Sequence, residues 1–395
     1  RYGFLFLINC STSFYNEPLF FIYALSEIIA LRSKAVLSTV LGISVILTIG
    51  FWSKLLPKDI IQLAHIPGIG ILTVGMLLVS LGTTIDFAEL RRQWQVAAVS
   101  VISVTMAVIF IIFLGPFFMN GTLAIAGSPI FAVGNAAMLI ILDAVQEKGI
   151  ETVGTFCIVL LVSQKFFGIP IASLMLRHLA KNLRDDRDFV KRYASEGKAE
   201  KANKPLRLPS LLDRPSVHLA KLSFVASLAY YASKLTGGAV HYLVMCLLFG
   251  TLFYALGFLE KGILQKTQSS GLILFFVTLV IFSSFSRTTP QDVLSVLPPL
   301  AATALLGVLG LFTAGLLTNR LFSLPFSLCV SLGVTCTFGF PTTMLVSQEV
   351  STAMGRNEEE RAALLHYLLP KMLVAGFVTV TITSVLLAGV VVTLL

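Results

Sequence analysis

The amino-acid sequence predicts an all-α polytopic membrane protein, built from two inverted repeats that each contain five transmembrane helices plus a re-entrant element. The first observation behind this prediction is composition, because 56% of the residues are hydrophobic and only 12% are charged. The charged share is about half that of a usual soluble domain. The second observation is that apolar runs long enough to span a bilayer recur along the whole chain. The third is a correspondence between the two halves of the chain.

Two stretches, residues 127–165 and 333–371, share a pattern although few of their residues are identical. A shift of 206 positions superposes them from Pro129 onward without a gap and places Lys165 on Lys371. Each stretch begins with an apolar segment rich in Gly, Pro or Thr, passes through a polar turn, and ends in a long apolar helix. Paired, interrupted hydrophobic segments at equivalent places in two halves indicate the binding site of a transporter.

The elements follow from the apolar runs in order. The first repeat, residues 1–180, is expected to have spans at 18–31, 35–53, 66–85, 94–117 and 151–179, with a re-entrant element at about 122–146. The second repeat, residues 217–395, is expected to have spans at 218–235, 239–259, 270–286, 297–319 and 361–394, with a re-entrant element at about 324–348. Residues 181–216 form a charged linker with ten Lys/Arg against six Asp/Glu.

The distribution of positive charge predicts the topology. If each interrupted segment enters and leaves the membrane on one side, 21 cationic side chains share the side of the linker and 6 lie opposite. Cytoplasmic loops carry an excess of Lys and Arg. We therefore expect a multi-pass protein of the cell (inner or plasma) membrane, with a cytoplasmic linker and both termini outside. Segments that crossed completely would give six spans per half and would break this bias. The net charge of +9 is then loop charge, and no nucleic-acid partner is expected.

The interrupted segments are the predicted site of the chemistry. Irregular backbone at membrane depth is tolerated only inside protein or along a water-filled cavity. The residues that loosen the helix or offer polar groups are Gly127, Ser128, Pro129, Gly134 and Asn135 in the first copy, and Thr335, Thr337, Gly339, Pro341, Thr342 and Thr343 in the second. Freed carbonyls would coordinate a cation, and helix N-termini favour an anionic group. The alternative is that small residues merely let helices pack closely.

Lys165 and Lys371 are the sharpest single signals. Each lies about 13 residues, or about 20 Å of rise, into its helix. A charge at that depth is costly unless it faces a partner or water, so a functional role is expected. Three roles stay open: pairing with a substrate carboxylate, replacing a coupling cation, or carrying a proton. The alternative is an ammonium satisfied by backbone carbonyls at a helix irregularity, which the neighbouring Gln164 and Pro370 would fit.

The remaining polar and sulfur-containing residues are less informative. Asp143 and Glu349 lie toward the ends of the interrupted segments, where they are either functional or simply exposed. His366 is expected to be an ordinary polar residue of its helix. The five cysteines, at positions 10, 157, 246, 329 and 336, lack disulfide or metal spacing, so ordinary packing is expected.

These residues carry a family resemblance. The segment Cys336–Thr343, followed by a turn at Gly355 and a long final helix, resembles the second re-entrant segment of the glutamate:sodium symporter family. A set of small and polar residues is similar to that family's first one: Gly127, Ser128, Gly134, Asn135 and Gly149. The related 2-hydroxycarboxylate (citrate) transporters share the general plan. The resemblance covers nearly the whole chain as architecture but only about twenty residues as motif.

The resemblance implies a secondary active transporter, a cation-coupled symporter of elevator type, with a rigid scaffold that forms a homodimer. Its substrate would be a small organic anion such as glutamate or a di-/tricarboxylate. The substrate-binding residues that the resemblance implies are Ser128, Gly134, Asn135, Thr337, Gly339, Thr342 and Thr343, and the buried-charge argument adds Lys165 and Lys371. The implied coupling-ion or charge-substituting residues are Gly127, Thr335, Gln164, Lys165 and Lys371, with Na⁺ held by backbone carbonyls near Gly134 and Gly339.

Two departures from the family bear on the coupling ion. The interrupted segments contain fewer glycines than the family's loops, and two mid-helix lysines are not expected in its usual members. Fixed cations would replace sodium or hold a second carboxylate, so the coupling ion is either Na⁺ or H⁺. No other cofactor is expected.

Other function classes fit less well. A cation/proton antiporter of similar inverted-repeat plan is the main alternative, but it would need a mid-membrane aspartate pair that the chain does not show centrally. A membrane scaffold or regulator gives no reason for duplicated helix breaks and buried lysines. The chain contains no G-x-x-x-x-G-K-[ST] motif and no acid–base grouping, so enzyme activity is not expected.

Overall fold

A computed structural model describes residues 2–33, 37–83, 93–132, 151–199, 213–235, 242–280 and 289–383, together with 387 and 391. Within these ranges all regular elements are helical and no strand occurs, which confirms the all-α class. Three helices of the described chain are long and apolar enough to cross a membrane: Trp94–Phe117, Val153–Arg184 and Leu297–Phe322. These helices agree with the predicted membrane class. The number of spans and their orientation stay predictions.

The helices are named in chain order. Those of the first half are α1 (Tyr2–Arg32), α2 (Thr39–Trp52), α3 (Ile60–Leu63), α4 (Ile66–Gly82), α6 (Trp94–Leu114), η1 (Gly115–Phe117), α7 (Gly121–Phe131), α9 (Glu151–Arg184) and α10 (Arg187–Ala199). Those of the second half are α11 (Pro215–Leu235), α12 (Tyr242–Ala255), α13 (Ile263–Lys266), α14 (Ser270–Val280), α15 (Pro290–Ser295), α16 (Leu297–Phe322), α17 (Phe326–Val334), η3 (Thr335–Thr337), α18 (Thr342–Met354), α19 (Glu358–Phe377) and η4 (Val378–Thr383). The charged linker therefore begins as helix, because α9 extends to Arg184 and α10 follows.

Helix bounds recur between the two halves at a constant offset. The ends of α2 and α12 differ by 203 residues, and α3 and α13 repeat this offset at both ends. The turns repeat it as well. Lys54 (φ 60°) pairs with Gly257 (φ 75°), and His65 (φ 56°) pairs with Gln268 (φ 53°), each 203 residues apart and each in the left-handed region. Such agreement in backbone shape supports the predicted duplication.

The chain folds into two compact units. The first unit comprises residues 1–23, 57–92 and 199–283, and the second comprises residues 24–56, 93–198 and 284–395. Each unit thus takes segments from both halves of the sequence.

In the first unit, α4 packs along α12 and α14, with α11 beside it. The α4–α12 contact is made through glycine. A Cβ atom on Gly250 would collide with the backbone carbonyl of Val79, and one on Gly82 would collide with the carbonyl of Leu247. The two helices therefore approach backbone to backbone, as small residues allow in membrane proteins.

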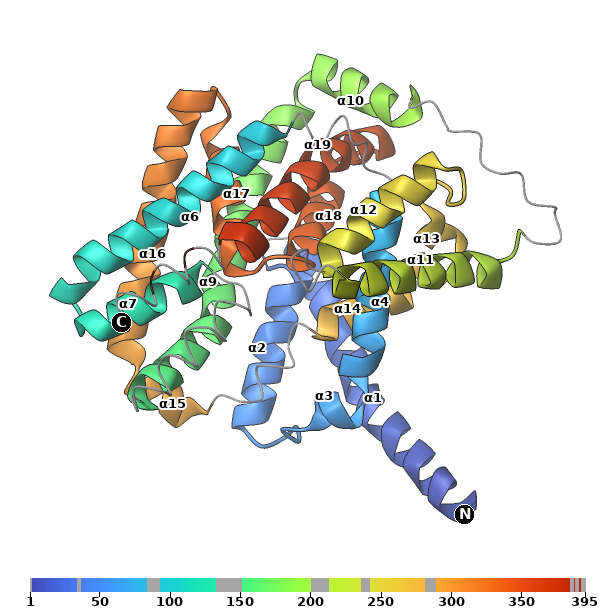
Figure 1. Cartoon of the computed structure of the whole chain (residues 1–395), viewed down its shortest axis with the longest axis horizontal. Helices are drawn as coiled ribbons and strands as arrows, with labels where there is room; N and C mark the ends of the chain where they lie inside the picture. The colour runs from blue at the N-terminus through green and yellow to red at the C-terminus, as the bar shows by residue number, and fades with distance from the viewer. Residues whose placement is uncertain are drawn as a thin grey trace. The chain divides into compact units, whose positions relative to one another are not determined.

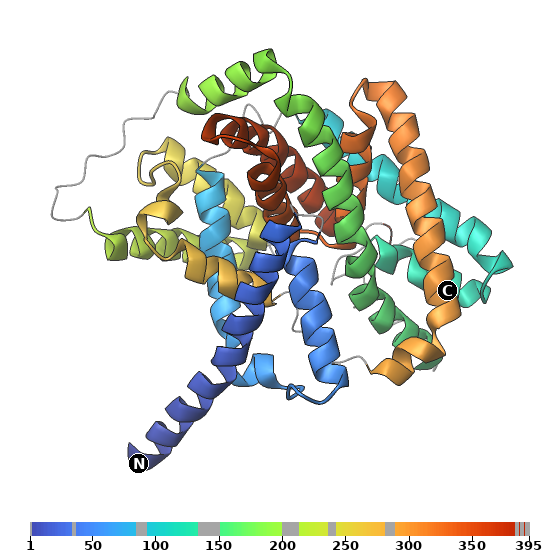
Figure 2. The ribbon, with the colours of Figure 1, turned by 180° about the vertical axis from the view of Figure 1, so that it is seen from behind.

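In the second unit, α6 packs along α16, and the two helices lie side by side in both views (Figures 1 and 2). α7 and α17 pack against this pair, α9 contacts α7, α17 and α18, and α19 packs on α18. Local sequence signals start several of these helices. Thr289 and Asp292 form a capping box at α15, and the Asn357 side chain accepts the N–H of Glu360 at the start of α19.

The α4–α12 contact gives a first prediction. Gly250→Ala should lower the free energy of unfolding by roughly 1–3 kcal/mol, because the added methyl group meets backbone that cannot give way. Gly271→Ala is the matched control, since a Cβ atom there has nothing within 4 Å. It should be neutral or stabilising, because alanine favours helix over glycine. Thermal unfolding of the two purified variants in detergent measures the difference, and equal melting temperatures would contradict the close contact.

Candidate functional site

The helical hairpin α17–α18 is interrupted in the middle of the second unit. α17 ends at Val334, the short helix η3 follows, and Gly339 adopts φ 58°, a conformation that favours glycine, before α18 begins at Thr342. The polar side chains around this break are all fully buried: Ser331, Thr335, Thr337, Thr342, Thr343 and Ser347. The sequence placed Thr335, Thr337, Gly339, Thr342 and Thr343 in one interrupted segment, and the structure brings these residues together at one break.

The hydroxyl groups of the break fall into two classes. The Thr335 and Thr337 hydroxyls donate to the carbonyls of Leu332 (2.6 Å) and Val334 (2.8 Å) of their own chain segment. The Oγ1 atoms of Thr342 and Thr343, in contrast, are buried and have no hydrogen-bond partner among the residues that the structure describes. Leaving a buried hydroxyl unsatisfied costs about 1–3 kcal/mol, so such a pair calls for an explanation such as a missing water, ion or ligand.

α9 covers the break with one stripe of its surface. A Cβ atom on Gly168 would collide with the Thr337 hydroxyl, so only glycine lets α9 come this close. One turn earlier, the Gln164 side chain is fully buried. Its amide nitrogen donates to the carbonyl of Leu161 (3.2 Å), and its Oε1 atom has no partner in the described ranges. Gln164 therefore offers an unused polar group on the same face of α9 as Gly168.

α7 reaches the break from the other half of the sequence. The Cys336 thiol lies 3.8 Å from the carbonyl of Phe131, the last residue of α7. Gly127 and Ser128 are buried on α7: a Cβ atom on Gly127 would lie 2.8 Å from the Phe156 ring, and the Ser128 hydroxyl donates to the Ile125 carbonyl (3.0 Å). The predicted residues Gly134, Asn135 and Asp143 lie outside the described residues.

The end of α19 and the stretch η4 close a third side of the break. The hydroxyls of Thr335 and Thr379 lie 3.5 Å apart, and a Cβ atom on Gly376 would lie 2.9 Å from the Thr343 methyl group. Thr379 belongs to η4, a π-helical stretch that continues α19. Single-turn π-helical stretches are frequent at functional sites. The break is thus enclosed by α7, α9, α19 and η4.

The two predicted lysines lie on the helices that enclose the break. Lys371 is buried on α19, where its ammonium donates to the Tyr367 carbonyl (3.1 Å) and lies 3.7 Å from the centroid of the Tyr367 ring. Its side chain therefore reaches back toward the start of α19, whereas the contacts with the break are made further along, at Gly376. Lys165 is half-buried on α9, next to Gln164.

Glu349 is also part of the second unit's polar framework. Its Oε1 atom accepts the backbone N–H of Thr39, the first residue of α2, at 2.9 Å. Its Oε2 atom is buried without a partner. A carboxylate at a helix N-terminus is favoured by the helix dipole, so this contact attaches α2 to α18.

An apolar cavity of about 280 Å³ lies between α2, α9 and α15. Its lining comes from Val45, Thr48, Ile49, Trp52, Val162, Ser163, Phe166 and Val293. It faces a different side of α9 from Gln164 and Gly168. Its chemistry suits an apolar chain rather than a carboxylate, so we do not place an anion there.

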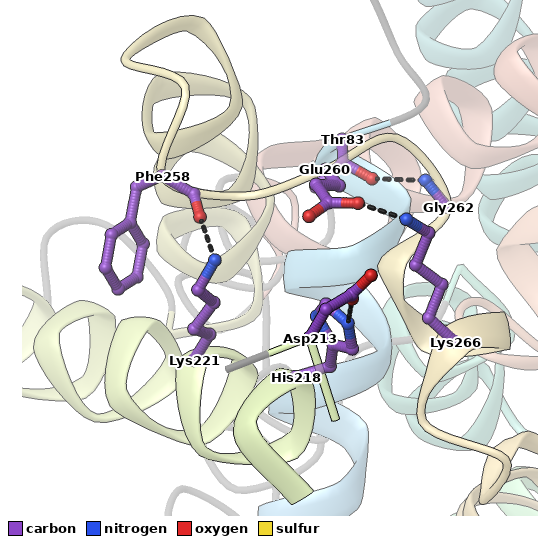
Figure 3. A network of polar contacts seen from close by, with 8 residues as sticks. All are labelled: Thr83, Asp213, His218, Lys221, Phe258, Glu260, Gly262 and Lys266. Atoms are coloured by element: carbon purple, nitrogen blue, oxygen red, sulfur yellow. Dashed lines mark hydrogen bonds and ion pairs between the residues drawn. The ribbon is translucent and has the colours of Figure 1, made fainter. Parts of the chain in front are cut away.

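The first unit contains a separate polar network, drawn in Figure 3. His218 is hydrogen-bonded to Asp213 (2.8 Å), Lys266 forms an ion pair with Glu260, and the Lys221 ammonium donates to the Phe258 carbonyl (3.0 Å). Potential metal-ligand atoms of Asp213, His218 and Glu260 lie within 4.8 Å of one another. Lys266 already neutralises Glu260, and the Lys221–Phe258 hydrogen bond attaches α11 to the chain before α13.

This network predicts a pH dependence of stability. The hydrogen bond from His218 lowers the pKa of Asp213, and the hydrogen bond to Glu260 raises the pKa of Lys266. A carboxylate with a lowered pKa stabilises the fold above its unfolded-state pKa of about 3.9, and this stabilisation is lost as pH falls through the folded-state value. The lysine contribution is present below its unfolded-state pKa of about 10.4 and is lost as pH rises through the raised value.

His218→Ala should therefore flatten the acid side of the stability profile. Between pH 5 and pH 2 the unsubstituted protein should lose more thermal stability than the variant, because only the unsubstituted protein loses the Asp213–His218 pair. Thermal unfolding in detergent across this range measures the effect. A stability difference that does not change with pH would show that the contact carries no charge-dependent stabilisation.

The unpartnered hydroxyls give a second stability prediction for this site. Thr342→Val and Thr343→Val should leave the melting temperature unchanged or raise it, because valine keeps the shape and removes an unsatisfied polar group worth about 1–3 kcal/mol. Thr318→Val is the control, since the Thr318 hydroxyl donates to the Ala314 carbonyl (2.7 Å). Thr318→Val should not raise the melting temperature. If the two site variants melted well below the control, the hydroxyls would have partners after all.

Sequence reasoning did not identify several residues at or near the break: Gly168, Gly376 and Thr379, which contact it, Ser103 of α6, which contacts α17, and Tyr367, which contacts Lys371. Gly168 did carry a signal, because an isolated glycine inside a helix costs about 1 kcal/mol relative to alanine and usually has a packing reason. Ser103 of α6 has a buried hydroxyl without a partner, and a Cβ atom on Gly333 would lie 2.8 Å from that oxygen. Nothing in the sequence around Ser103 marks this residue, because the contact in question is made with Gly333 of α17.

Comparison of the chain with protein-family models and with curated proteins gives no match.

Proposed function

We propose that this protein is a secondary active transporter for a small organic anion, such as glutamate or a di-/tricarboxylate, and that it works by cation-coupled alternating access of the elevator type. The observation that carries this proposal is the pair of buried hydroxyls of Thr342 and Thr343 at the first turn of α18, which have no partner among the described residues. A substrate carboxylate would accept both hydrogen bonds, and the positive end of the α18 dipole would favour its charge.

The surroundings of the break define the proposed binding residues. Thr337 and Gly339 form the wall between η3 and α18, and α7 contributes Gly127 and Ser128 from the opposite repeat. Gln164 adds a buried polar atom without a partner on α9. An amide that can accept a hydrogen bond suits a substrate with an amino group, so Gln164 favours an acidic amino acid over a simple dicarboxylate.

The duplicated backbone supports the proposed mechanism. The 203-residue offset of helix bounds and left-handed turns is what two copies of one repeat would produce. We propose that the copies are inverted, that the linker is cytoplasmic, that both termini are outside, and that the protein forms a homodimer. On this proposal the chain is a member of the glutamate:sodium symporter family.

The proposed site for a coupling ion lies at the same break. The Gly339 carbonyl accepts the Thr343 N–H (3.1 Å) and keeps a second lone pair for a cation such as Na⁺. Thr335 would act beside it. Lys165 and Lys371 supply fixed positive charge on the two enclosing helices, in place of a second bound cation or as proton carriers.

The experiment is uptake of labelled glutamate, and of a set of dicarboxylates, into proteoliposomes with imposed sodium or proton gradients. Thr342→Val and Thr343→Val should each reduce uptake efficiency by about tenfold or more, because a hydrogen bond to a charged group contributes about 1.5–3 kcal/mol. Thr318→Val, whose hydroxyl bonds its own helix, should transport like the unsubstituted protein.

The outcomes separate the possible mechanisms. Uptake driven by sodium would support carbonyl coordination of Na⁺, and uptake driven by protons alone would assign the coupling role to the lysines. Unchanged uptake in both threonine variants would refute the proposed site. Cation exchange without uptake of any organic anion would favour the antiporter alternative.

A further inference from the structure

The environment of Lys371 contains a feature that the proposed transport site does not use. The Lys371 ammonium lies over the face of the Tyr367 ring, 3.7 Å from its centroid, and also donates to the Tyr367 carbonyl (3.1 Å). The carbonyl is fixed by the helix, but the ring is attached by rotatable bonds. A cation over the face of an aromatic ring is attracted by the ring's quadrupole, and more strongly when water is excluded, so the position of the ammonium depends on the orientation of this ring.

The Tyr367 ring is held by two aromatic side chains of the linker helix α10. Phe189 meets it at 5.3 Å with an interplanar angle of 78°, and Tyr193 meets it at 5.3 Å and 80°. Phe189 and Tyr193 also contact each other at 4.8 Å, one turn apart on α10. Two edge-to-face contacts of this kind leave the Tyr367 ring little room to turn.

α10 is itself anchored where it begins. The Arg184 guanidinium donates to the Met354 carbonyl (2.7 Å), and the Arg356 guanidinium donates to Asp185 (2.8 Å). These bonds attach the end of α9 to the turn between α18 and α19. Figures 1 and 2 both show α10 next to α19, as the aromatic contacts require.

We propose that Phe189 and Tyr193 are positioning residues that fix the position of the Lys371 ammonium through the Tyr367 ring. The linker helix α10 would thereby control the position of a buried charge in the second unit. When α10 is packed on α19, the ring faces Lys371 and holds the ammonium one turn back from the break. When α10 is released, the ring rotates and the ammonium loses its π contact. The consequence for transport rests on the proposed function, but the positioning itself does not.

The first measurement needs no transport. Reductive methylation of the purified protein in detergent, quantified for each lysine by mass spectrometry, reports how accessible the Lys371 ammonium is. The double substitution Phe189→Ala/Tyr193→Ala should speed methylation of Lys371 about fivefold, which is the scale of one to two aromatic contacts. Lys191→Ala, on the exposed side of the same helix, is the matched control and should leave the rate unchanged.

A second pair of variants tests the ring directly. Tyr367→Phe keeps the ring and should methylate at the unsubstituted rate, whereas Tyr367→Leu removes the ring and should resemble the α10 double variant. An equal Lys371 rate in the α10 double variant and in Lys191→Ala would overturn the proposal. A rise that also occurs at the other lysines would overturn it too, because it would indicate general unfolding.

Uptake into proteoliposomes then distinguishes this inference from the proposed function. If both are correct, the α10 double variant and Tyr367→Leu should lower maximal uptake with little change in KM, because the residues do not contact substrate. Changed methylation together with no uptake of any organic anion by the unsubstituted protein would refute the proposed function and leave the positioning role standing. Normal uptake with unchanged methylation would overturn the positioning role alone.

Discussion

The structure of the second unit depends on one constraint: a helix that stops inside the protein must have its polar groups satisfied away from bulk water. The α17–α18 break meets this constraint by burial against α7, α9, α19 and η4, and most of its hydroxyls bond the preceding turn. Close enclosure requires small residues opposite the break, which is why Gly168 and Gly376 stand where they do. Thr342 and Thr343 are the exceptions, because their buried hydroxyls have no partner in the described part of the chain.

The helices α2 and α12, whose ends lie 203 residues apart, pack against different neighbours. α12 approaches α4 through Gly250, whereas the residue 203 positions earlier, on α2, is Leu47. A leucine cannot admit a neighbouring backbone at that distance, and Leu47 is instead fully buried in the second unit. A single small-to-large difference thus accounts for part of the asymmetry between α2 and α12. Side-chain size decides which neighbour each of the two helices packs against.

Much of the fold could be read from the sequence, because apolar runs and helix-breaking residues are local signals. The all-α class, the interruption near Gly339 and the burial of Cys157, Cys246, Cys329 and Cys336 were predicted in this way and are confirmed. The depth of Lys371 was also predicted, but the direction of its side chain was not. That direction depends on Tyr367, Phe189 and Tyr193, residues brought together across more than 170 positions of chain. Contacts of this kind arise only in the tertiary structure.

The bond between Glu349 and the first N–H of α2 has a mechanical consequence. It ties the start of α2 to α18. If the α17–α18 hairpin moved, α2 would have to move with it, or the part-buried hydrogen bond between the Thr39 N–H and the Glu349 carboxyl group would break. α2 would then move with the hairpin, whereas α12, its counterpart at the 203-residue offset, belongs to the other compact unit. The carboxyl group of Glu349 would therefore couple the movement of α2 to that of α18, and substituting Glu349 would free α2 without changing the residues of the break.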